Sequence, residues 1–228
     1  MKKDFWLERW EREEIGFHQD EFNPYLRLYW QETHLADDSL VFVPLCGKSR
    51  DMLWLREQGH QVLGVELSAI AVQAFFKENG YSPQHISPNQ VSPNQVIGGK
   101  FDCYEANGIR ILCGDFFDLS KEDLANVKAV YDRASLIALP PEMRESYVRH
   151  LVSILPPATQ ILLITVEYPQ HEMEGPPFSV SIGEVEALYR EHAEVRLLAQ
   201  LDVLAQNPRF QVRGLSRLRE NIFLLTLR

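Results

Sequence analysis

Two short, continuous apolar runs, at residues 40–45 and 61–65, constrain the fold of this chain more than any other feature. A strand that is buried on both faces of a parallel sheet shows such an uninterrupted run, whereas a strand with one solvated face alternates. Each run is followed by a helical pattern, at 50–58 and 68–79, that ends beside a glycine. This alternation of strand and helix predicts an α/β fold with a doubly wound sheet.

The same rhythm continues over most of the remaining chain. Further strands are predicted at 109–113, 127–131 and 160–166, a helix at 183–192, and a closing pair of strands at 195–204 and 221–227. This order indicates an open, mostly parallel sheet with helices on both faces. Because no proline- or glycine-rich linker separates two halves, we expect one domain over residues 1–228.

Two segments interrupt the rhythm. Residues 4–34 are predicted to form amphipathic helices with a break at Asn23-Pro24. Residues 81–100 are predicted to form a loop, because the pentapeptide Ser-Pro-Asn-Gln-Val occurs there twice, at 87–91 and 92–96, and is followed by two glycines.

The charge balance excludes several classes of partner. The chain has 23 lysines and arginines against 32 acidic residues, a net charge of −9. A nucleic-acid backbone or an anionic membrane needs a basic face, so we expect neither as a partner. No apolar run approaches the roughly 20 residues that span a bilayer. Since no interface signal stands out, we expect a monomer.

The cysteines indicate a reducing compartment. There are three, Cys46, Cys103 and Cys113, an odd number without CxxC spacing. A disulfide scaffold and a zinc site are therefore disfavoured, and we predict a cytoplasmic protein without a metal.

The candidate binding site lies where the first two strands end. Ligands of open α/β sheets bind at the carboxyl ends of the strands. Gly47 would let the backbone approach a ligand closely, and the following helix N-terminus offers unpaired N–H groups. Glu66, at the end of the second strand, could accept hydrogen bonds from a ribose diol. Alone, Gly47 could serve a turn and Glu66 could cap a helix; together they favour an adenosine-containing cofactor.

The next two strand ends carry further candidates. Asp115 and Phe116 could bind an adenine amino group and cover the ring, or form a turn and a core aromatic. Asp132 and Arg133 are either a structural ion pair or site groups, and their position at a strand end favours the site. Neither GxGxxG nor GxxxxGK[ST] is present, so a dinucleotide fingerprint and a Walker A loop are not supported.

Several motifs, taken in order, resemble the thiopurine S-methyltransferase family. They cover nearly the whole chain, and Pro44-Leu45-Cys46-Gly47-Lys48 is the most specific of them. The others are Phe17-His18-Gln19, Gly59-His60 with Val65-Glu66, Phe117-Asp118-Leu119, Asp132-Arg133, Gly175-Pro176-Pro177-Phe178 and Leu224-Leu225-Thr226. The chain resembles a compact bacterial member.

The resemblance implies a class I, Rossmann-like methyltransferase fold, with a seven-stranded sheet whose last strand is antiparallel. It implies S-adenosylmethionine as methyl donor and S-adenosylhomocysteine as product. The implied acceptor is a small aromatic or heterocyclic thiol, and bacterial relatives are also associated with selenium and tellurium compounds.

The resemblance also implies roles for individual residues. Residues 1–34 would form a helical lid over the cofactor, and Arg133 would lie near both cofactor and acceptor, favouring the reactive thiolate without accepting a proton. The implied cofactor contacts are Trp6, Trp10, Leu45, Gly47, Glu66, Asp115, Phe116 and Arg133; the implied acceptor contacts are Phe17, Arg133, Pro177, Phe178 and Arg209. Two departures stand out: the family often has a smaller hydroxyl residue where this chain has Asp115, and the doubled pentapeptide is an insertion.

Two alternatives stay open at this stage. A nicotinamide-dependent oxidoreductase would use Glu66 equally well on its ribose, although GxGxxG is missing. The second alternative is a methyltransferase-like domain that binds a cofactor or a partner but has lost methyl-transfer activity. The intact set of Trp10, Leu45, Glu66 and Arg133 counts against this alternative.

Overall fold

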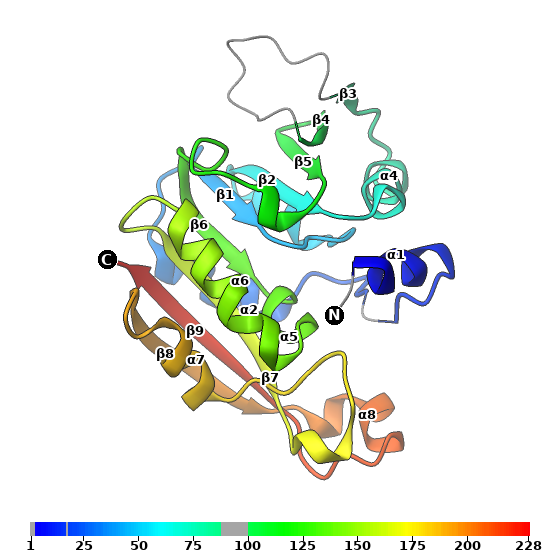
Figure 1. Cartoon of the computed structure of the whole chain (residues 1–228), viewed down its shortest axis with the longest axis vertical. Coiled ribbons are helices and arrows are strands. Elements are labelled where there is room, and N and C mark those ends of the chain that lie inside the picture. The colour runs from blue at the N-terminus through cyan, green and yellow to red at the C-terminus, as the bar shows by residue number, and fades with distance from the viewer. Residues whose placement is uncertain (1–2, 17, 88–99) are drawn as a thin grey trace.

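A computed structural model describes residues 3–16, 18–87 and 100–228 and contains one nine-stranded sheet over these residues (Figure 1). The strand order is β3-β4-β5-β2-β1-β6-β7-β9-β8. The strands are β1 (Leu40–Val43), β2 (Gln61–Glu66), β3 (Gln84–Ile86), β4 (Asp102–Ala106), β5 (Ile109–Cys113), β6 (Val127–Asp132), β7 (Gln160–Glu167), β8 (Ala193–Asp202) and β9 (Arg219–Leu227).

The middle of the sheet is parallel and contains the point where strand order reverses. Strands β5, β2, β1, β6 and β7 pair in parallel, and the chain leaves β1 toward β2 on one side before returning to β6 on the other. The loops after β1 and β6 therefore meet at one crevice, where ligands of such sheets bind. At the far edge β9 lies antiparallel between β7 and β8.

Helices cover both faces of the sheet (Figure 1). Alternate strand residues supply the two cores: Phe42 and Val130 pack on the face of α6 and α7, while Val41 and Tyr131 pack on the face of α2, α3 and α4. The helices are α1 (Lys3–Glu11), α2 (Pro24–Tyr29), α3 (Asp51–Glu57), α4 (Ala69–Glu78), α5 (Ser135–Ala138), α6 (Pro141–Ile154), α7 (Ile182–Tyr189) and α8 (Pro208–Val212), with 3-10 turns at η1 (Trp30–Thr33), η3 (Phe116–Asp118), η4 (Gln170–Glu172) and η5 (Leu204–Gln206). None of these helices is long and apolar enough to cross a membrane.

The predicted strands at 109–113, 127–131, 160–166 and 221–227 are confirmed to within two residues. Two expectations need correction. The sheet has nine strands rather than seven, because β3 and β4 add an antiparallel hairpin beside β5, inside and just after the segment expected to be a loop. The doubled pentapeptide, apart from Ser87, lies outside the described residues.

The N-terminal region is less helical than expected. Helix α1 ends at Glu11, and Glu13 takes a left-handed φ of 56° that a continuing helix could not contain. The break at Asn23 is confirmed, since its side-chain oxygen accepts the N–H groups of Tyr25 and Leu26 and so caps α2.

Candidate functional site

A cavity of about 1130 Å³ opens at the carboxyl ends of the parallel strands. Its walls come from α1, the loops after β1, β5 and β6, α5, the chain near Pro176, α8 and the start of β9. Ligand pockets commonly measure about 300–1,000 Å³. This cavity is therefore large enough for two small molecules that lie side by side.

The loop after β1 turns sharply beneath α1. Leu45 and Gly47 both take left-handed φ angles, 45° and 53°, and both line the cavity. A Cβ atom added to Gly47 would lie 3.4 Å from Cζ2 of Trp10. The ring of Trp10 is buried, whereas Trp6, edge-on to Phe5, is half-buried, and both tryptophans border the cavity. Helix α1 thus places the two predicted lid tryptophans on the cavity wall.

Glu66 joins the ends of β1 and β2. Its Oε2 accepts the Gly47 N–H at 2.9 Å, and its Oε1 accepts the Ser68 N–H at 2.8 Å. Burial raises the pKa of the Glu66 carboxyl, and these N–H donors oppose that rise. Each carboxylate oxygen has two lone pairs, so Glu66 can also accept hydrogen bonds from a ligand diol.

Asp115 and Phe116 border the cavity and also fulfil the structural roles weighed from the sequence. Asp115 Oδ1 accepts the Phe117 N–H at 3.0 Å, which caps η3, and its carboxylate forms an ion pair with Lys3 of α1. Phe116 is 2% exposed, with its ring centroid 4.8 Å from that of Tyr147. The rim of the cavity is thereby tied to the N-terminal helix.

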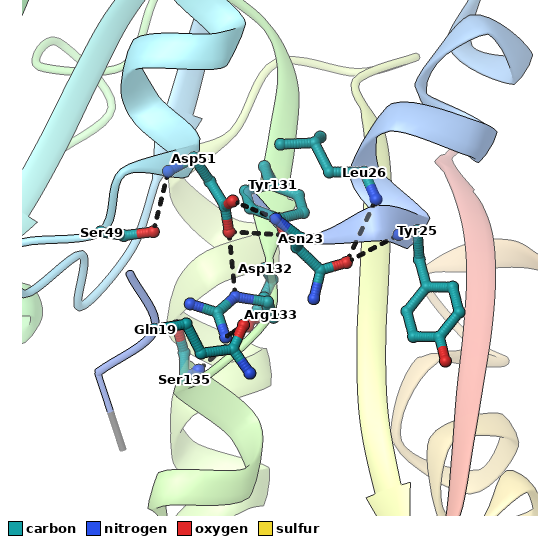
Figure 2. A network of polar contacts seen from close by, with 10 residues as sticks. All are labelled: Gln19, Asn23, Tyr25, Leu26, Ser49, Asp51, Tyr131, Asp132, Arg133 and Ser135. Carbon is teal, nitrogen blue, oxygen red and sulfur yellow. Dashed lines mark hydrogen bonds and ion pairs between the residues drawn. The ribbon is translucent and has the colours of Figure 1, made fainter. Parts of the chain in front are cut away.

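Arg133 follows β6 and enters a buried polar network (Figure 2). Its Nε lies 3.0 Å from Asp51 Oδ2, and its Nη1 donates to Gln19 Oε1 at 3.0 Å. Asp51 also accepts the hydroxyl of Tyr131 at 2.9 Å. Burial, together with the charge of Asp51, raises the pKa of Tyr131. Of the two readings weighed for Asp132 and Arg133, a structural ion pair or site groups, the structure shows Arg133 on the cavity wall and paired with Asp51. Asp132 accepts a hydrogen bond from Tyr147 at 2.6 Å.

Glu220, which the sequence analysis did not single out, lies on the cavity wall at the start of β9. Burial raises the pKa of its carboxyl, while a hydrogen bond with Tyr25 and the charges of Arg133 and Arg209 oppose the rise. Arg209 also lines the cavity, donates from Nη1 to the Gly16 carbonyl at 2.6 Å, and has its pKa lowered by burial. The only sequence signal for Glu220 is an acidic residue at the head of an apolar strand.

Part of the proline loop lies on the cavity wall. Pro176 and Pro177 line the cavity, and the Pro177 carbonyl accepts the Tyr168 hydroxyl at 2.6 Å. Phe178 does not line this cavity, and its N–H donates to the Ile137 carbonyl at 2.7 Å. Phe17, the remaining predicted acceptor contact, lies outside the described residues.

Cys46 lies beside the site but is not suited to act as a nucleophile. The side chain is 6% exposed, and burial raises the pKa of its thiol well above the ordinary value. Within residues 3–16, 18–87 and 100–228 no group of three or more His, Cys, Asp or Glu side chains could hold a metal ion.

Known proteins resemble the chain over its full length. The family model described as thiopurine S-methyltransferase matches residues 1–228. A protein named thiopurine S-methyltransferase from Nitrosospira multiformis is 65% identical over 228 residues, covering 100% of this chain and 99% of that protein. One of the same name from Pseudomonas fluorescens strain Pf0-1 is 48% identical over 223 residues, covering 98% of each.

Solved structures share the fold at low identity. A 1,6-didemethyltoxoflavin-N1-methyltransferase from Burkholderia thailandensis, with 1,6-didemethyltoxoflavin and S-adenosylhomocysteine bound, aligns with a TM-score of 0.61 and 16% identity, over 99% of this chain and 86% of that one. An S-adenosylmethionine-dependent methyltransferase from Methanosarcina mazei aligns with a TM-score of 0.56 and 15% identity, over 90% and 98%. These likenesses confirm the predicted class I methyltransferase fold.

Proposed function

Because the chain belongs to the thiopurine S-methyltransferase family, we propose that it transfers a methyl group from S-adenosylmethionine to the sulfur atom of aromatic or heterocyclic thiols, releasing S-adenosylhomocysteine. One observation carries the proposal: a single cavity has Gly47 and Glu66 on its wall, and also Arg133 and Arg209. The first pair suits a nucleoside and the second pair suits an electron-rich acceptor.

The cofactor would lie along the loop after β1. Glu66 would accept hydrogen bonds from the ribose diol, and Leu45 with Gly47 would contact the methionine portion. Asp115 and Phe116 would hold the adenine, while Trp6 and Trp10 would cover the sulfonium and exclude water. When bound, S-adenosylmethionine supplies a methyl group on a positively charged sulfur. These side chains would hold the cofactor in a fixed position beside the acceptor, and such positioning can supply a large part of the rate enhancement.

The acceptor would lie toward α8 and β9. The thiolate is the reactive form of a thiol, and a guanidinium favours it without accepting a proton. We assign this role to Arg133, with Arg209 and Pro177 as further acceptor contacts. Phe17 and Phe178 are also proposed as acceptor contacts, from the resemblance alone. A pocket suited to soft sulfur nucleophiles also suits selenium and tellurium compounds, which we propose as additional acceptors.

The wider setting follows from the same features. We propose that residues 1–228 act as one methyltransferase domain, with residues 1–34 as its lid, and that the protein works as a cytoplasmic monomer. A net charge of −9 supports a small-molecule acceptor rather than a nucleic acid or an anionic membrane. The alternatives of an oxidoreductase and of an inactive domain gain no support from the family match.

Calorimetric titration tests the cofactor part of the proposal. Saturable binding of S-adenosylmethionine and S-adenosylhomocysteine is expected, with NAD as a control that does not bind. Glu66→Ala should abolish this binding, whereas Glu57→Ala, on the exposed surface of α3, should leave it intact. Binding of NAD alone would contradict the proposal, and binding of none of the three would point to an inactive domain.

Enzyme kinetics test the role of Arg133. Arg133→Ala should lower kcat/KM for a thiol acceptor by about a hundredfold, because an oriented charge at the reacting atom is lost. Arg217→Ala, on the exposed chain before β9, is the matched control and should retain wild-type kinetics. If Arg133→Ala kept the wild-type rate within about twofold at every pH tested, the assigned role would be wrong.

A further inference from the structure

We propose that Asp51 is the positioning residue for Arg133, and that it links the orientation of this arginine to the segment that follows the first helix. The inference rests on the proposed function, in which Arg133 serves the acceptor sulfur. It concerns a side chain that does not itself line the cavity.

Asp51 is the first residue of α3 and is 1% exposed (Figure 2). Its two carboxylate oxygens have three partners, one before α2 and two at the end of β6. Oδ1 accepts the backbone N–H of Asn23 at 2.7 Å, while Oδ2 accepts the hydroxyl of Tyr131 at 2.9 Å and lies 3.0 Å from Nε of Arg133. A buried carboxylate needs such partners, since an unpaired charge in the interior is costly.

These contacts fix how Arg133 can lie. A guanidinium has five N–H donors in one plane. Asp51 engages the donor at Nε, and Gln19 accepts one donor from Nη1 at 3.0 Å. Two points of attachment at different edges hold the plane of the guanidinium, and the remaining Nη donors are left for a ligand in the cavity that Arg133 lines. Without Asp51, Arg133 would keep only one of these two contacts, the hydrogen bond to Gln19.

The same carboxylate holds the chain between α1 and α2. Asn23, bound to Asp51 through its N–H, uses its side chain to cap α2, and Arg50 donates from Nη1 to the Asp20 carbonyl at 2.9 Å. Gln19 and Asn23 both line the cavity. Asp51 therefore contributes both to the placement of this segment and to the orientation of Arg133, so disturbing either should disturb the other.

A purely structural role is the competing explanation. An acidic residue in the first turn of a helix interacts favourably with the helix macrodipole, so Asp51 could serve only to stabilise α3. A double-mutant cycle separates the two. Asn23 and Arg133 bind different oxygens of the carboxylate, and Asp51→Asn keeps an oxygen at only one of those two places, so the side chain cannot accept from both. Acceptor kinetics, S-adenosylhomocysteine affinity and the Tm are measured for Asp51→Asn, Arg133→Ala and the double variant.

If Asp51 positions Arg133, Asp51→Asn lowers kcat/KM for the acceptor by about a hundredfold, as expected for a misplaced catalytic group. In the Arg133→Ala background the same change has almost no further effect on kcat/KM, because the group it positions is gone. The Kd of S-adenosylhomocysteine should change far less than kcat/KM in Asp51→Asn, because Asp51 itself does not line the cavity. Equal losses in both backgrounds overturn the proposal, as does wild-type kcat/KM in Asp51→Asn.

Tyr131→Phe is the matched variant, since it removes a second partner of the same carboxylate oxygen but leaves the bond to Arg133. It should cost kcat/KM no more than about threefold, and a loss as large as that of Asp51→Asn contradicts the proposal.

A measurement on the wild-type protein keeps the inference testable if Asp51→Asn fails to fold or if the protein methylates no thiol. NMR of arginine side chains should show slow hydrogen exchange at Nε of Arg133 and fast exchange at the exposed Arg217. Equally fast exchange at both overturns the proposal. An inactive wild type with a protected Arg133 would instead contradict only the proposed function.

Discussion

Replacing Gly47 with alanine tests the close packing between the loop after β1 and the first helix. Gly47 has a φ of 53°, and in the left-handed region a side chain costs about 1–2 kcal/mol. At about 2–4 °C of Tm per kcal/mol for a chain of this size, Gly47→Ala should lower the Tm by about 2–8 °C. The new methyl group would also lie 3.4 Å from the Trp10 ring, filling the space beside the backbone that a ligand would otherwise approach.

Gly80→Ala supplies the matched control. Gly80, after α4, has a φ of 71°, and an added Cβ would meet nothing within 4 Å. Both variants should lose similar stability by thermal unfolding. Only Gly47→Ala should weaken S-adenosylhomocysteine binding, by about tenfold in Kd, which corresponds to ~1.4 kcal/mol. If calorimetry gave the two variants the same Kd, the Gly47–Trp10 contact would not belong to the cofactor site, and the reasoning would be refuted.

Three further results are expected. Burial raises the pKa of Glu66, so its carboxylate becomes protonated at a higher pH than the carboxylate of an exposed glutamate. The affinity for S-adenosylhomocysteine should therefore fall on acidification before pH 4.5 is reached. An affinity that calorimetry finds independent of pH would count against the ribose role. Burial also raises the thiol pKa of Cys46 far above its ordinary value and the thiol pKa of Cys103 and Cys113 to about 11. Iodoacetamide should therefore label the native protein slowly at neutral pH, as followed by mass spectrometry. Rapid labelling of Cys46 would contradict its burial. Arg144 is 1% exposed and is hydrogen-bonded to the Leu139 carbonyl and to Glu184. Arg144→Ala should therefore lower the free energy of unfolding by about 3 kcal/mol and the Tm by ~6–12 °C, whereas Arg149→Ala, at an exposed position on the same helix, should change the Tm little. Equal shifts in Tm would refute the structural role of Arg144.

The parts of the fold that were predictable have strong local signals. The strands β1 and β2 are buried on both faces, so their sequences are apolar without alternation. The hairpin of β3 and β4 lies at the sheet edge, where Gln84 and His85 are exposed, and such polar strands resemble loops in sequence. Helix α5 spans only Ser135–Ala138, too few residues to show a helical period.

The same distinction holds for the candidate site. Gly47 and Glu66 were predictable because Gly47 lies in the loop after one apolar strand and Glu66 ends the next, and the structure joins them by a hydrogen bond. Asp51 and Gln19 were not, because their relation to the site comes from residues far along the chain: Tyr131 is 80 positions from Asp51, and Arg133 is 114 from Gln19. No local pattern encodes such contacts; tertiary packing creates them.

Direct observation of the transferred methyl group tests the central claim. The purified protein is incubated with S-adenosylmethionine that carries a deuterated methyl group and with a thiopurine, and the products are analysed by mass spectrometry and NMR. The account predicts S-adenosylhomocysteine and a thiopurine with the deuterated methyl group on sulfur, and loss of both products in Glu66→Ala. Methylation at a ring nitrogen, or no transfer by a protein that binds S-adenosylhomocysteine, would contradict it.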